Sequence, residues 1–290
     1  MNRYKIFSNA KINIGLNVFQ KENDGYHEID SIMAPIDLSD EMDIIFYSEA
    51  GKLKIECSDK NIPIDERNIL FKTYKIFFEE SKKEKEKIDI YLKKNIPSEA
   101  GLGGGSSNAG FFLKLLNKHY GNIYNEKELE ELAMKIGSDV PFFIKNKTAR
   151  VGGKGNKLEV IENNLKDSVI LIKLIDFGVS TKEAYNSFDN LKEVKYADFD
   201  KIIKCLKDNN RIVLESHIEN SLEQGILKIN TDIKMLKITL NSVISGKKFF
   251  MSGSGSTYYT FVTELEKSQI ETRLKTFVDN VKIMICKIIN

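Results

Sequence analysis

Cysteine is scarce in this 290-residue sequence, and the spacing of the cysteines argues against two common kinds of cross-link, disulfide bonds and structural zinc sites. The three cysteines, Cys57, Cys205 and Cys286, lie far apart, and no two of them have C-x-x-C spacing. Disulfide frameworks and structural zinc sites use closely spaced cysteines. We therefore expect neither here, and a reducing compartment, the cytoplasm, fits the sequence.

Long apolar runs are also missing. Residues 1–8 lack an apolar segment long enough for a signal peptide. No stretch approaches the roughly 20 apolar residues that a membrane-spanning helix needs. We expect neither secretion nor a membrane partner.

A large excess of charge of one sign is the third absence. Lysine and arginine total 44 against 42 aspartates and glutamates, which gives a net charge of +2. Nucleic-acid-binding domains usually concentrate basic residues on one face, so we expect no nucleic-acid partner. With 41% hydrophobic and 30% charged residues, the chain has the composition of a globular protein with a real core.

A glycine-rich segment, residues 97–109, stands out among what is present. Its sequence is P-S-E-A-G-L-G-G-G-S-S-N-A. Apolar residues alternate before it as in a strand, and after it they recur at helical spacing. At such a junction the first N–H groups of the helix lack partners, and glycine lets a ligand approach the backbone. The segment therefore predicts a phosphate-binding loop.

Two familiar nucleotide motifs do not fit this loop. A Walker A motif needs a lysine after its last glycine, but Ser106 follows Gly105. Ser106 also occupies the third glycine position of a dinucleotide fingerprint counted from Gly101. A flexible linker is the remaining alternative. Pro97 and Leu102 favour a loop of fixed shape instead.

Other polar positions have ordinary structural explanations when each is taken alone. Residues 10–18 alternate as a strand does, and three polar residues share one face: Lys11, Asn13 and Asn17. A strand with one solvated face would explain them. Tyr26 and His27 follow an Asn-Asp-Gly turn and fit partly buried packing, and Asp139 fits a helix cap.

The remaining periodicity predicts an α+β protein with a break near residue 160. Strands are expected at residues 42–47, 53–57, 88–92, 169–175 and 282–288. Helices are expected at 69–79, which Asn68 would cap, and at 108–120, 129–136, 201–207, 218–227 and 270–278. Residues 150–156 and 249–259 are predicted hairpin turns. The break divides the chain into domains 1–160 and 161–290.

Six segments, taken in order, resemble the motifs of the GHMP kinase superfamily. They are residues 10–13, 24–27, 97–109, 137–141, 178–181 and 251–256. The Asp-Gly-Tyr-His turn and the Gly-x-Asp-Val-Pro segment are most similar to members that act on 4-diphosphocytidyl-2-C-methyl-D-erythritol. The resemblance implies a two-domain GHMP kinase fold. An ATP-binding domain of the ribosomal protein S5 domain 2 type, residues 1–160, would precede an α+β domain, residues 161–290.

The same resemblance implies an ATP-dependent kinase of the non-mevalonate isoprenoid precursor pathway, which phosphorylates the 2-hydroxyl of that cytidine diphosphate alcohol. It places the catalytic pair on Lys11 and Asp139. Asp139 would accept the proton of the substrate hydroxyl, and Lys11 would orient this hydroxyl and offset developing negative charge. ATP and Mg²⁺ are the expected cofactors.

Binding residues follow from the resemblance as well. Asn13 would contact the methylerythritol end, and Tyr26, His27 and Tyr185 the cytidine end. Asn68 would lie near the adenine. The phosphates would be bound by Pro97, Ser98, Glu99, Ala100, Gly101, Leu102, Gly103, Gly104, Gly105, Ser106 and Ser107. Either serine hydroxyl could reach Mg²⁺.

Two alternatives stay open. One is a GHMP kinase for mevalonate, homoserine or a sugar, and the other is a catalytically silent nucleotide-binding protein on the same fold. Gly110 departs from the alanine usual in the family and is expected to weaken its helix by up to about 1 kcal/mol. Oligomeric state and protein partners are not fixed by the sequence.

Overall fold

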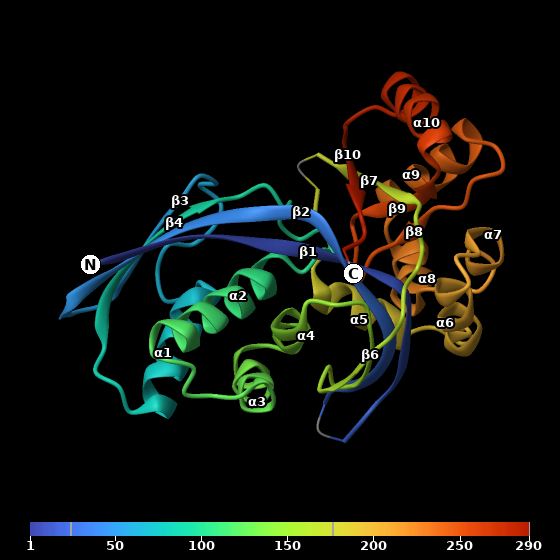
Figure 1. Cartoon of the computed structure of the whole chain (residues 1–290). Helices are drawn as coiled ribbons and strands as arrows, with labels where there is room; N and C mark the ends of the chain where they lie inside the picture. The colour runs from blue at the N-terminus through green and yellow to red at the C-terminus, as the bar shows by residue number, and fades with distance from the viewer. Residues whose placement is uncertain (24, 176, 290) are drawn as a thin grey trace. The chain divides into compact units, whose positions relative to one another are not determined.

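The computed structural model describes residues 1–23, 25–175 and 177–289, which form two compact units (Figure 1). Unit 1 comprises Met1–Ala10, Leu38–Pro97 and Gly103–Asn146, and unit 2 comprises Lys11–Asp37, Ser98–Leu102 and Lys147–Asn290. Both contain helices and sheet strands, so the predicted α+β class is confirmed. The domain boundary near residue 160 stays a prediction.

Two long strands contribute residues to both units. They are β1 (Asn2–Lys21) and β2 (His27–Ala50), which pair with each other. The sequence predicted shorter strands, at residues 10–18 and 42–47. Charged residues such as Arg3 and Lys21 at the ends of β1 conceal its length, because strand propensity is a weak guide wherever sheet pairing holds the backbone extended.

In unit 1, the second half of β2 pairs antiparallel with β4 (Glu86–Lys93), which pairs in parallel with β3 (Leu53–Cys57). Helices cover one face of these strands (Figure 1), namely α1 (Ile69–Ser81), α2 (Gly104–His119), α3 (Glu126–Ile136) and α4 (Val140–Lys145). Ile90 of β4 packs in a buried core with Phe77 of α1 and Phe112 of α2. Burying these apolar faces is what holds the helices on the sheet.

The glycine-rich segment joins β4 to α2, as predicted. The helix begins at Gly104, earlier than the predicted start at residue 108. Gly103 enters the helix with a left-handed φ of 70°, and the Ser107 N–H closes the first turn on the Gly103 carbonyl at 2.8 Å. Glycine and serine are poor helix formers, so the periodicity alone placed the start too late.

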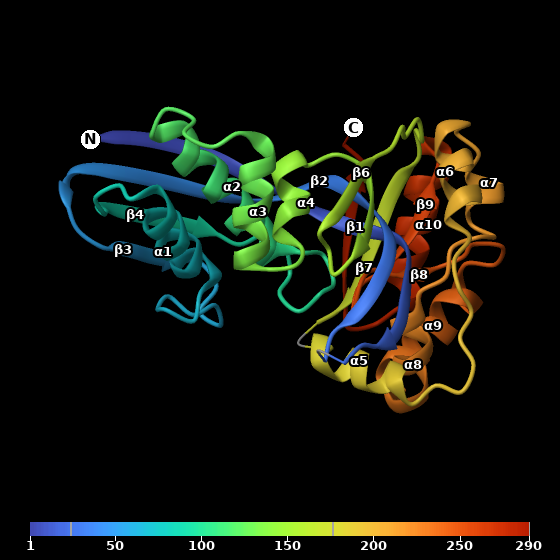
Figure 2. The same ribbon diagram turned by 90° about the horizontal axis from the view of Figure 1, so that it is seen from below.

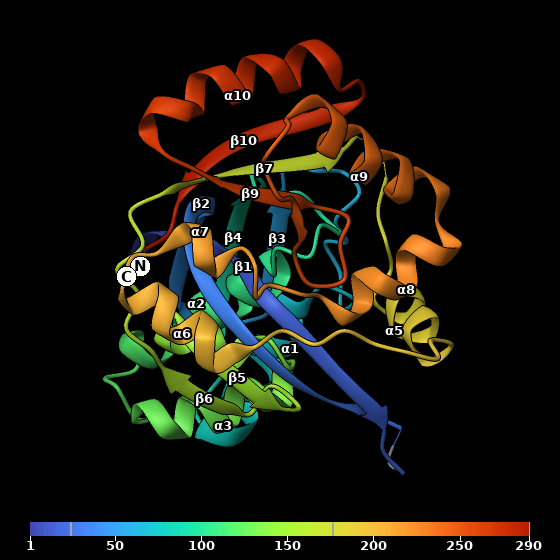
Figure 3. The same cartoon turned by 90° about the vertical axis from the view of Figure 1, so that its right-hand side faces the viewer.

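Unit 2 contains a four-stranded antiparallel sheet in the order β10-β7-β9-β8 (Figure 3). Its strands are β7 (Ser168–Leu174), β8 (Phe250–Met251), β9 (Tyr258–Val262) and β10 (Val281–Lys287). A hairpin of β5 (Ala149–Gly153) and β6 (Lys157–Val160) pairs with the first half of β2, which confirms the turn predicted at residues 150–156. The strand-loop-strand predicted at residues 249–259 is confirmed as β8 and β9.

Helices complete unit 2. The set is α5 (Thr181–Asp189), α6 (Phe199–Lys207), α7 (Arg211–Leu214), α8 (Ser221–Ile229), α9 (Thr231–Val243) and α10 (Glu264–Phe277). The apolar faces of α5, α8, α9 and α10 share one buried core, to which Ile170 of β7, Ile226 of α8 and Leu274 of α10 belong. In Figure 2, seen from below, α5 and α8 lie side by side. Within the described residues, no helix is long and apolar enough to span a bilayer.

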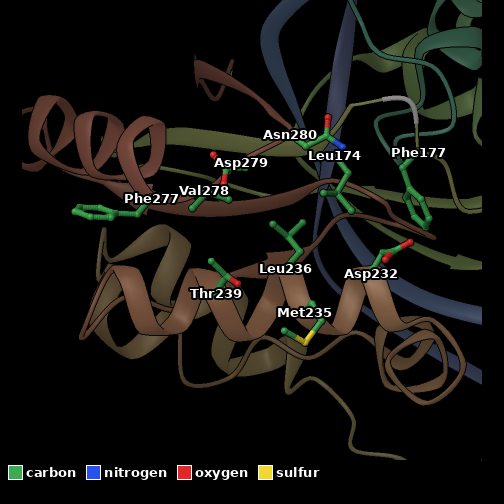
Figure 4. A pocket seen from close by; sticks show the side chains of 10 residues that line it. All are labelled: Leu174, Phe177, Asp232, Met235, Leu236, Thr239, Phe277, Val278, Asp279 and Asn280. Carbon is green, nitrogen blue, oxygen red and sulfur yellow. The ribbon is translucent and has the colours of Figure 1, made fainter.

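A cavity of about 520 Å³ lies beside α9 (Figure 4). Leu174 and Val278 face Leu236 across it, and Asp232 and Asp279 add carboxylates. The residues that line it, all of them described, include none of the predicted site residues. The predicted active-site residues therefore lie outside this cavity.

Candidate active site

Strand β1 carries Lys11 and Asn13 on one face, as predicted, and both side chains are almost completely buried, with 3% and 2% exposure. The Lys11 ammonium donates to Asn13 Oδ1 at 2.5 Å and to the Gly101 carbonyl at 2.8 Å. The backbone N–H of Lys11 also donates to the Leu102 carbonyl at 3.0 Å. Part of the predicted phosphate loop therefore lies directly against the predicted catalytic lysine.

The loop between β8 and β9 forms a further wall of this arrangement. Ser252 Oγ donates to the Gly101 carbonyl at 2.9 Å and accepts from the Asn13 N–H at 3.3 Å. A Cβ on Gly253 would lie 3.2 Å from the Lys11 Nζ. We call Lys11, Asn13, Gly101, Ser252 and Gly253 the lysine cluster. The sequence predicted a hairpin here, and residues 251–256 form one of the six motifs, yet none of them was predicted as a site residue.

The lysine cluster depends on glycine at position 101. Gly101 has a φ of 71°, and a Cβ there would lie 1.9 Å from the Ser252 carbonyl oxygen. No side chain fits at such a distance, and L-residues rarely adopt this φ. The structure thus gives this glycine a role in backbone-to-backbone contact, and the close approach of a ligand stays a prediction.

The orientation of the Asn13 amide is fixed by a buried serine. Asn13 Nδ2 donates to Ser31 Oγ at 2.8 Å, and Ser31 Oγ donates to the Gly15 carbonyl at 2.7 Å. Because the amide nitrogen is committed to Ser31, the amide oxygen faces Lys11. Tyr259 adds a bond from its hydroxyl to the Asn13 carbonyl at 2.8 Å. The result is a primary ammonium held in one place by protein acceptors.

A second set of predicted residues meets where β2 begins. His27 packs against Tyr185 of α5 with 4.9 Å between ring centroids, and its Nε2 lies 2.7 Å from Asp189 Oδ1. Phe188 contacts the same ring edge-on at 5.9 Å. We call His27, Tyr185, Phe188 and Asp189 the aromatic cluster. Asp189 was missed by the sequence, which offers no signal for a partner 162 residues away.

Tyr26 differs from its neighbour in exposure. Tyr26 is 64% exposed, whereas the His27 side chain is only 6% exposed. The ammonium of Lys154, from the β5–β6 hairpin, lies 5.7 Å from the centre of the Tyr26 ring and pairs with Glu22 at 2.9 Å. Asp24, the first residue of the predicted Asp-Gly-Tyr-His motif, lies outside the described residues. An exposed ring beside a buried one offers a flat face for stacking.

The rest of the phosphate loop is fixed in shape, which argues against a flexible linker. Ala100 and Leu102 are buried at 2% and 1% exposure. At the other end, Ser107 is fully buried and its hydroxyl donates to the Asn9 carbonyl at 2.6 Å. Ser106 is half-buried, so its hydroxyl is the more accessible of the two.

Gly110 has a packing role that the sequence did not reveal. A Cβ at this position would lie 2.8 Å from Phe143 Cβ and 3.2 Å from the Val140 carbonyl. The glycine lets α2 approach α4 closely. An alanine would require the two helices to separate, so any gain in helix propensity is opposed by overpacking.

Asp139 and Asn68 lie in unit 1, apart in the chain from the lysine cluster of unit 2. Asp139 occupies the N-cap position of α4, yet its side chain makes no capping bond, so the capping interpretation is wrong. Asn68 does cap α1, as predicted: its Oδ1 accepts from the Leu70 N–H at 3.0 Å. Its contact with adenine stays a prediction.

Comparison with known proteins places this geometry in a family. Residues 68–147 match the family model of the GHMP kinases N terminal domain. A 4-diphosphocytidyl-2-C-methyl-D-erythritol kinase from Fusobacterium nucleatum subsp. nucleatum is 87% identical over 290 residues, covering 100% of this chain and 99% of the relative. The chain belongs to the 4-diphosphocytidyl-2-C-methyl-D-erythritol kinase family. The superfamily resemblance of its six segments is confirmed.

Solved structures agree on the fold of this GHMP kinase. A crystal structure of 4-(cytidine 5'-diphospho)-2C-methyl-D-erythritol kinase has a TM-score of 0.77 at 24% identity, covering 98% of this chain and 99% of that one. A homoserine kinase from Cytophaga hutchinsonii has a TM-score of 0.76 at 18% identity, with 100% and 98% covered. At these identities the likeness shows the fold, and the predicted GHMP kinase fold is confirmed.

Proposed function

We propose that this GHMP kinase transfers the γ-phosphoryl group of ATP to the 2-hydroxyl of 4-diphosphocytidyl-2-C-methyl-D-erythritol. The 87% identity over the full chain to a kinase of that name carries the proposal. The products would be the 2-phosphate and ADP, within the non-mevalonate isoprenoid precursor pathway. Cytoplasmic location and the domain division at residue 160 are part of the same proposal.

Lys11 is suited to the role of electrostatic stabiliser. Its ammonium is held by two protein acceptors, Asn13 Oδ1 and the Gly101 carbonyl, so it needs little reorganisation when charge develops on the transferring group. Such a fixed cation in a water-poor site is worth more than one on a mobile side chain. We propose that the Lys11 ammonium orients the substrate hydroxyl and stabilises the negative charge that develops during phosphoryl transfer.

We assign the role of base to Asp139 because it occupies the aspartate position of the Gly-x-Asp-Val-Pro segment, at the N-terminus of α4. A carboxylate that accepts the hydroxyl proton late is sufficient in phosphoryl transfer, where positioning and electrostatics dominate. Lys11→Ala and Asp139→Asn each remove one of these roles, and because Lys11 is only 3% exposed, the fold of Lys11→Ala is checked alongside its activity. The two substitutions are therefore direct tests of the assignment.

The residues present fit a magnesium ion that arrives with ATP. No group of three His, Cys, Asp or Glu side chains able to hold a metal occurs in the described parts of the chain. Mg²⁺ needs no such cage, because it usually binds through a few protein oxygens and substrate phosphates. Ser106 is the serine that would contact it, since Ser107 donates to Asn9. When bound, Mg²⁺ neutralises charge on the phosphates.

The aromatic cluster and Tyr26 would bind the cytosine. When neutral His27 donates from Nε2 to Asp189, its Nδ1 becomes an acceptor. An acceptor at this position complements the exocyclic amino group of cytosine, and the exposed Tyr26 ring and Tyr185 provide faces for stacking. This arrangement discriminates against alcohols that lack the base.

The assay uses purified protein with Mg²⁺-ATP and the cytidine diphosphate alcohol, and it follows ADP release together with the phosphorylated product. Mevalonate and homoserine are parallel substrates, and a cytidine nucleotide is a competitor. We expect turnover with the cytidine substrate and competition by the nucleotide. Turnover with mevalonate or homoserine alone would identify a different GHMP kinase. Binding of ATP without turnover of any alcohol would identify a silent nucleotide-binding protein.

A further inference from the structure

Asn220 makes more hydrogen bonds than a helix N-cap residue needs. It precedes α8 and is 3% exposed, and its Oδ1 caps the helix by accepting from the N–H groups of Leu222 at 2.9 Å and Glu223 at 3.2 Å. Its Nδ2 donates to the carbonyls of Met251 at 2.8 Å and Gly253 at 2.9 Å. Capping explains the oxygen and leaves the two bonds of the nitrogen to be explained.

Those two bonds clamp the turn that faces Lys11. Met251 and Gly253 flank Ser252, whose hydroxyl donates to the Gly101 carbonyl. The same carbonyl accepts from the Lys11 ammonium at 2.8 Å. If the 251–253 turn moves, the acceptor that holds Lys11 moves with it. Gly253 and the Gly101 carbonyl are closely packed, because a Cβ on Gly253 would lie 3.1 Å from the carbonyl oxygen.

The clamp is anchored to the strand that carries the lysine. The Leu16 N–H of β1 donates to the carbonyl of Glu219, directly before Asn220, at 2.9 Å, and Leu16 forms a parallel bridge with Asn220 itself. Strand β1 is thus joined to the 251–253 turn twice, once through Asn220 and once through the lysine cluster. A closed set of hydrogen bonds of this kind holds a group more tightly than isolated pairs.

We propose that Asn220 is a positioning residue for Lys11, which acts by fixing the Met251 and Gly253 carbonyls and through them the acceptors of the lysine ammonium. The inference rests on the proposed function, because it takes Lys11 to act in catalysis. A group that is displaced by about 1 Å can cost about 100-fold in rate, so a clamp remote from the chemistry has a measurable effect.

The chain provides a matched control. Asn230 caps α9 in the same way, with Oδ1 accepting from the Ile233 N–H at 3.0 Å. In the described structure its amide nitrogen has no counterpart of the bonds to Met251 and Gly253. Aspartate is as good an N-cap as asparagine, so Asn→Asp keeps either cap and replaces the amide donor with an acceptor. The change at 220 breaks the clamp, and the change at 230 does not.

The experiment measures kcat, the KM for each substrate and the Tm of Asn220→Asp, Asn220→Ser and Asn230→Asp. We expect kcat to fall by about 10- to 100-fold in both position-220 variants, with the KM for the cytidine substrate unchanged and kcat normal in Asn230→Asp. Serine keeps the cap without introducing a buried charge, so Asn220→Ser remains informative if Asn220→Asp fails to fold.

A second readout does not depend on activity. In a ¹⁵N-labelled protein, the hydrogen-bonded ammonium of Lys11 should give a slowly exchanging NMR signal, assigned with Lys11→Ala, that weakens or disappears in Asn220→Ser. A normal kcat and an intact Lys11 signal in a folded position-220 variant would overturn the inference. Equal losses in Asn230→Asp would also overturn it, because capping would then be the cause. If Lys11→Ala itself turns over normally, the proposed function fails instead.

Discussion

The lysine cluster and the aromatic cluster are built by different means. The lysine cluster is held by backbone carbonyls and glycines in close contact, and its lysine is 3% exposed. The aromatic cluster is held by ring packing and one histidine–aspartate contact, with the exposed ring of Tyr26 adjacent in sequence. The first arrangement suits one fixed charge, and the second suits a flat ligand face that ring stacking recognises.

Two glycines show the same contrast. Gly101 and Gly25 have similar φ values, 71° and 86°. A Cβ on Gly101 would lie 1.9 Å from the Ser252 carbonyl oxygen, whereas a Cβ on Gly25 would meet nothing within 4 Å. At Gly25 only the turn conformation requires glycine, while at Gly101 both conformation and space require it. We therefore expect the chemistry to tolerate substitution less well than recognition does.

The largest effect is expected from removing the proposed catalytic groups. Lys11→Ala and Asp139→Asn should each lower kcat by about 10²- to 10⁴-fold, because each group acts on the transition state. Steady-state kinetics and circular dichroism would show a folded but nearly inactive protein. Lys147→Ala, at an exposed lysine, is the control and should be normal. A normal kcat in Asp139→Asn would remove the base from the mechanism.

Next in size is the effect of adding one methyl group at Gly101. Gly101→Ala should displace the 252–253 turn, reduce kcat strongly and destabilise the fold by about 1–3 kcal/mol through overpacking. Gly246→Ala has a comparable φ of 81° and open space around its Cβ, so it carries the backbone cost alone. Thermal unfolding and kcat of both variants separate the clash from the backbone strain. Equal effects would mean that close contact at Gly101 does not matter.

A smaller and different effect is expected in the aromatic cluster. Asp189→Ala should raise the KM for the cytidine substrate by about tenfold, or about 1.4 kcal/mol, while the KM for ATP and kcat stay near normal. The loss follows from freeing the His27 ring, whose Nε2 contacts Asp189. Asn186→Ala, on the same helix, is a control for helix α5. A rise in the KM for ATP would contradict the division between the two clusters.

The pH dependence of the free energy of unfolding shows over which pH range the fold stays stable, so that kinetics there report on the two clusters alone. Burial raises the pKa of Glu266, but hydrogen bonds from Lys247 and the Thr263 backbone outweigh this and lower the pKa from 4.5 to about 2. A lowered folded-state pKa adds stability that is present above about pH 4.5 and disappears as the pH falls toward 2.

Unfolding of wild type and Glu266→Gln in denaturant across this range should therefore show a difference that shrinks on acidification. Glu271→Gln, on the same helix, is the control. A constant difference would show that Glu266 does not titrate in this way. Kinetics above pH 5 would then report the two clusters without a contribution from acid unfolding.

The sequence predicted local elements well and contacts between distant segments poorly. The glycine loop, the strand with Lys11 and Asn13, and the helix cap Asn68 depend on neighbours in the chain, so spacing and residue chemistry reveal them. The bonds from Ser252 and Asn220 join segments that only the fold brings together. Helix α9 was missed as well, and the long strands β1 and β2 were predicted too short.

The prediction of site residues had the same limit: residues within a motif were predicted, and residues brought together only by the fold were not. Family motifs gave Lys11, Asp139, Tyr26 and His27 as site residues, and their roles remain proposals. Asp189 has no motif of its own and became visible only through its distance to His27. Gly110 was expected to be a weakness of its helix, but the close approach of Phe143 gives it a packing function. Such roles are properties of tertiary distance, which periodicity does not encode.

The central claim is that the lysine cluster serves catalysis and the aromatic cluster serves binding of the cytidine substrate. The most direct test measures the Kd of that substrate without turnover, by calorimetry, in Lys11→Ala and His27→Ala. We predict a Kd near that of wild type in Lys11→Ala and a Kd at least about tenfold weaker in His27→Ala. The reverse order, with the lysine variant losing affinity and the histidine variant keeping it, would contradict the account.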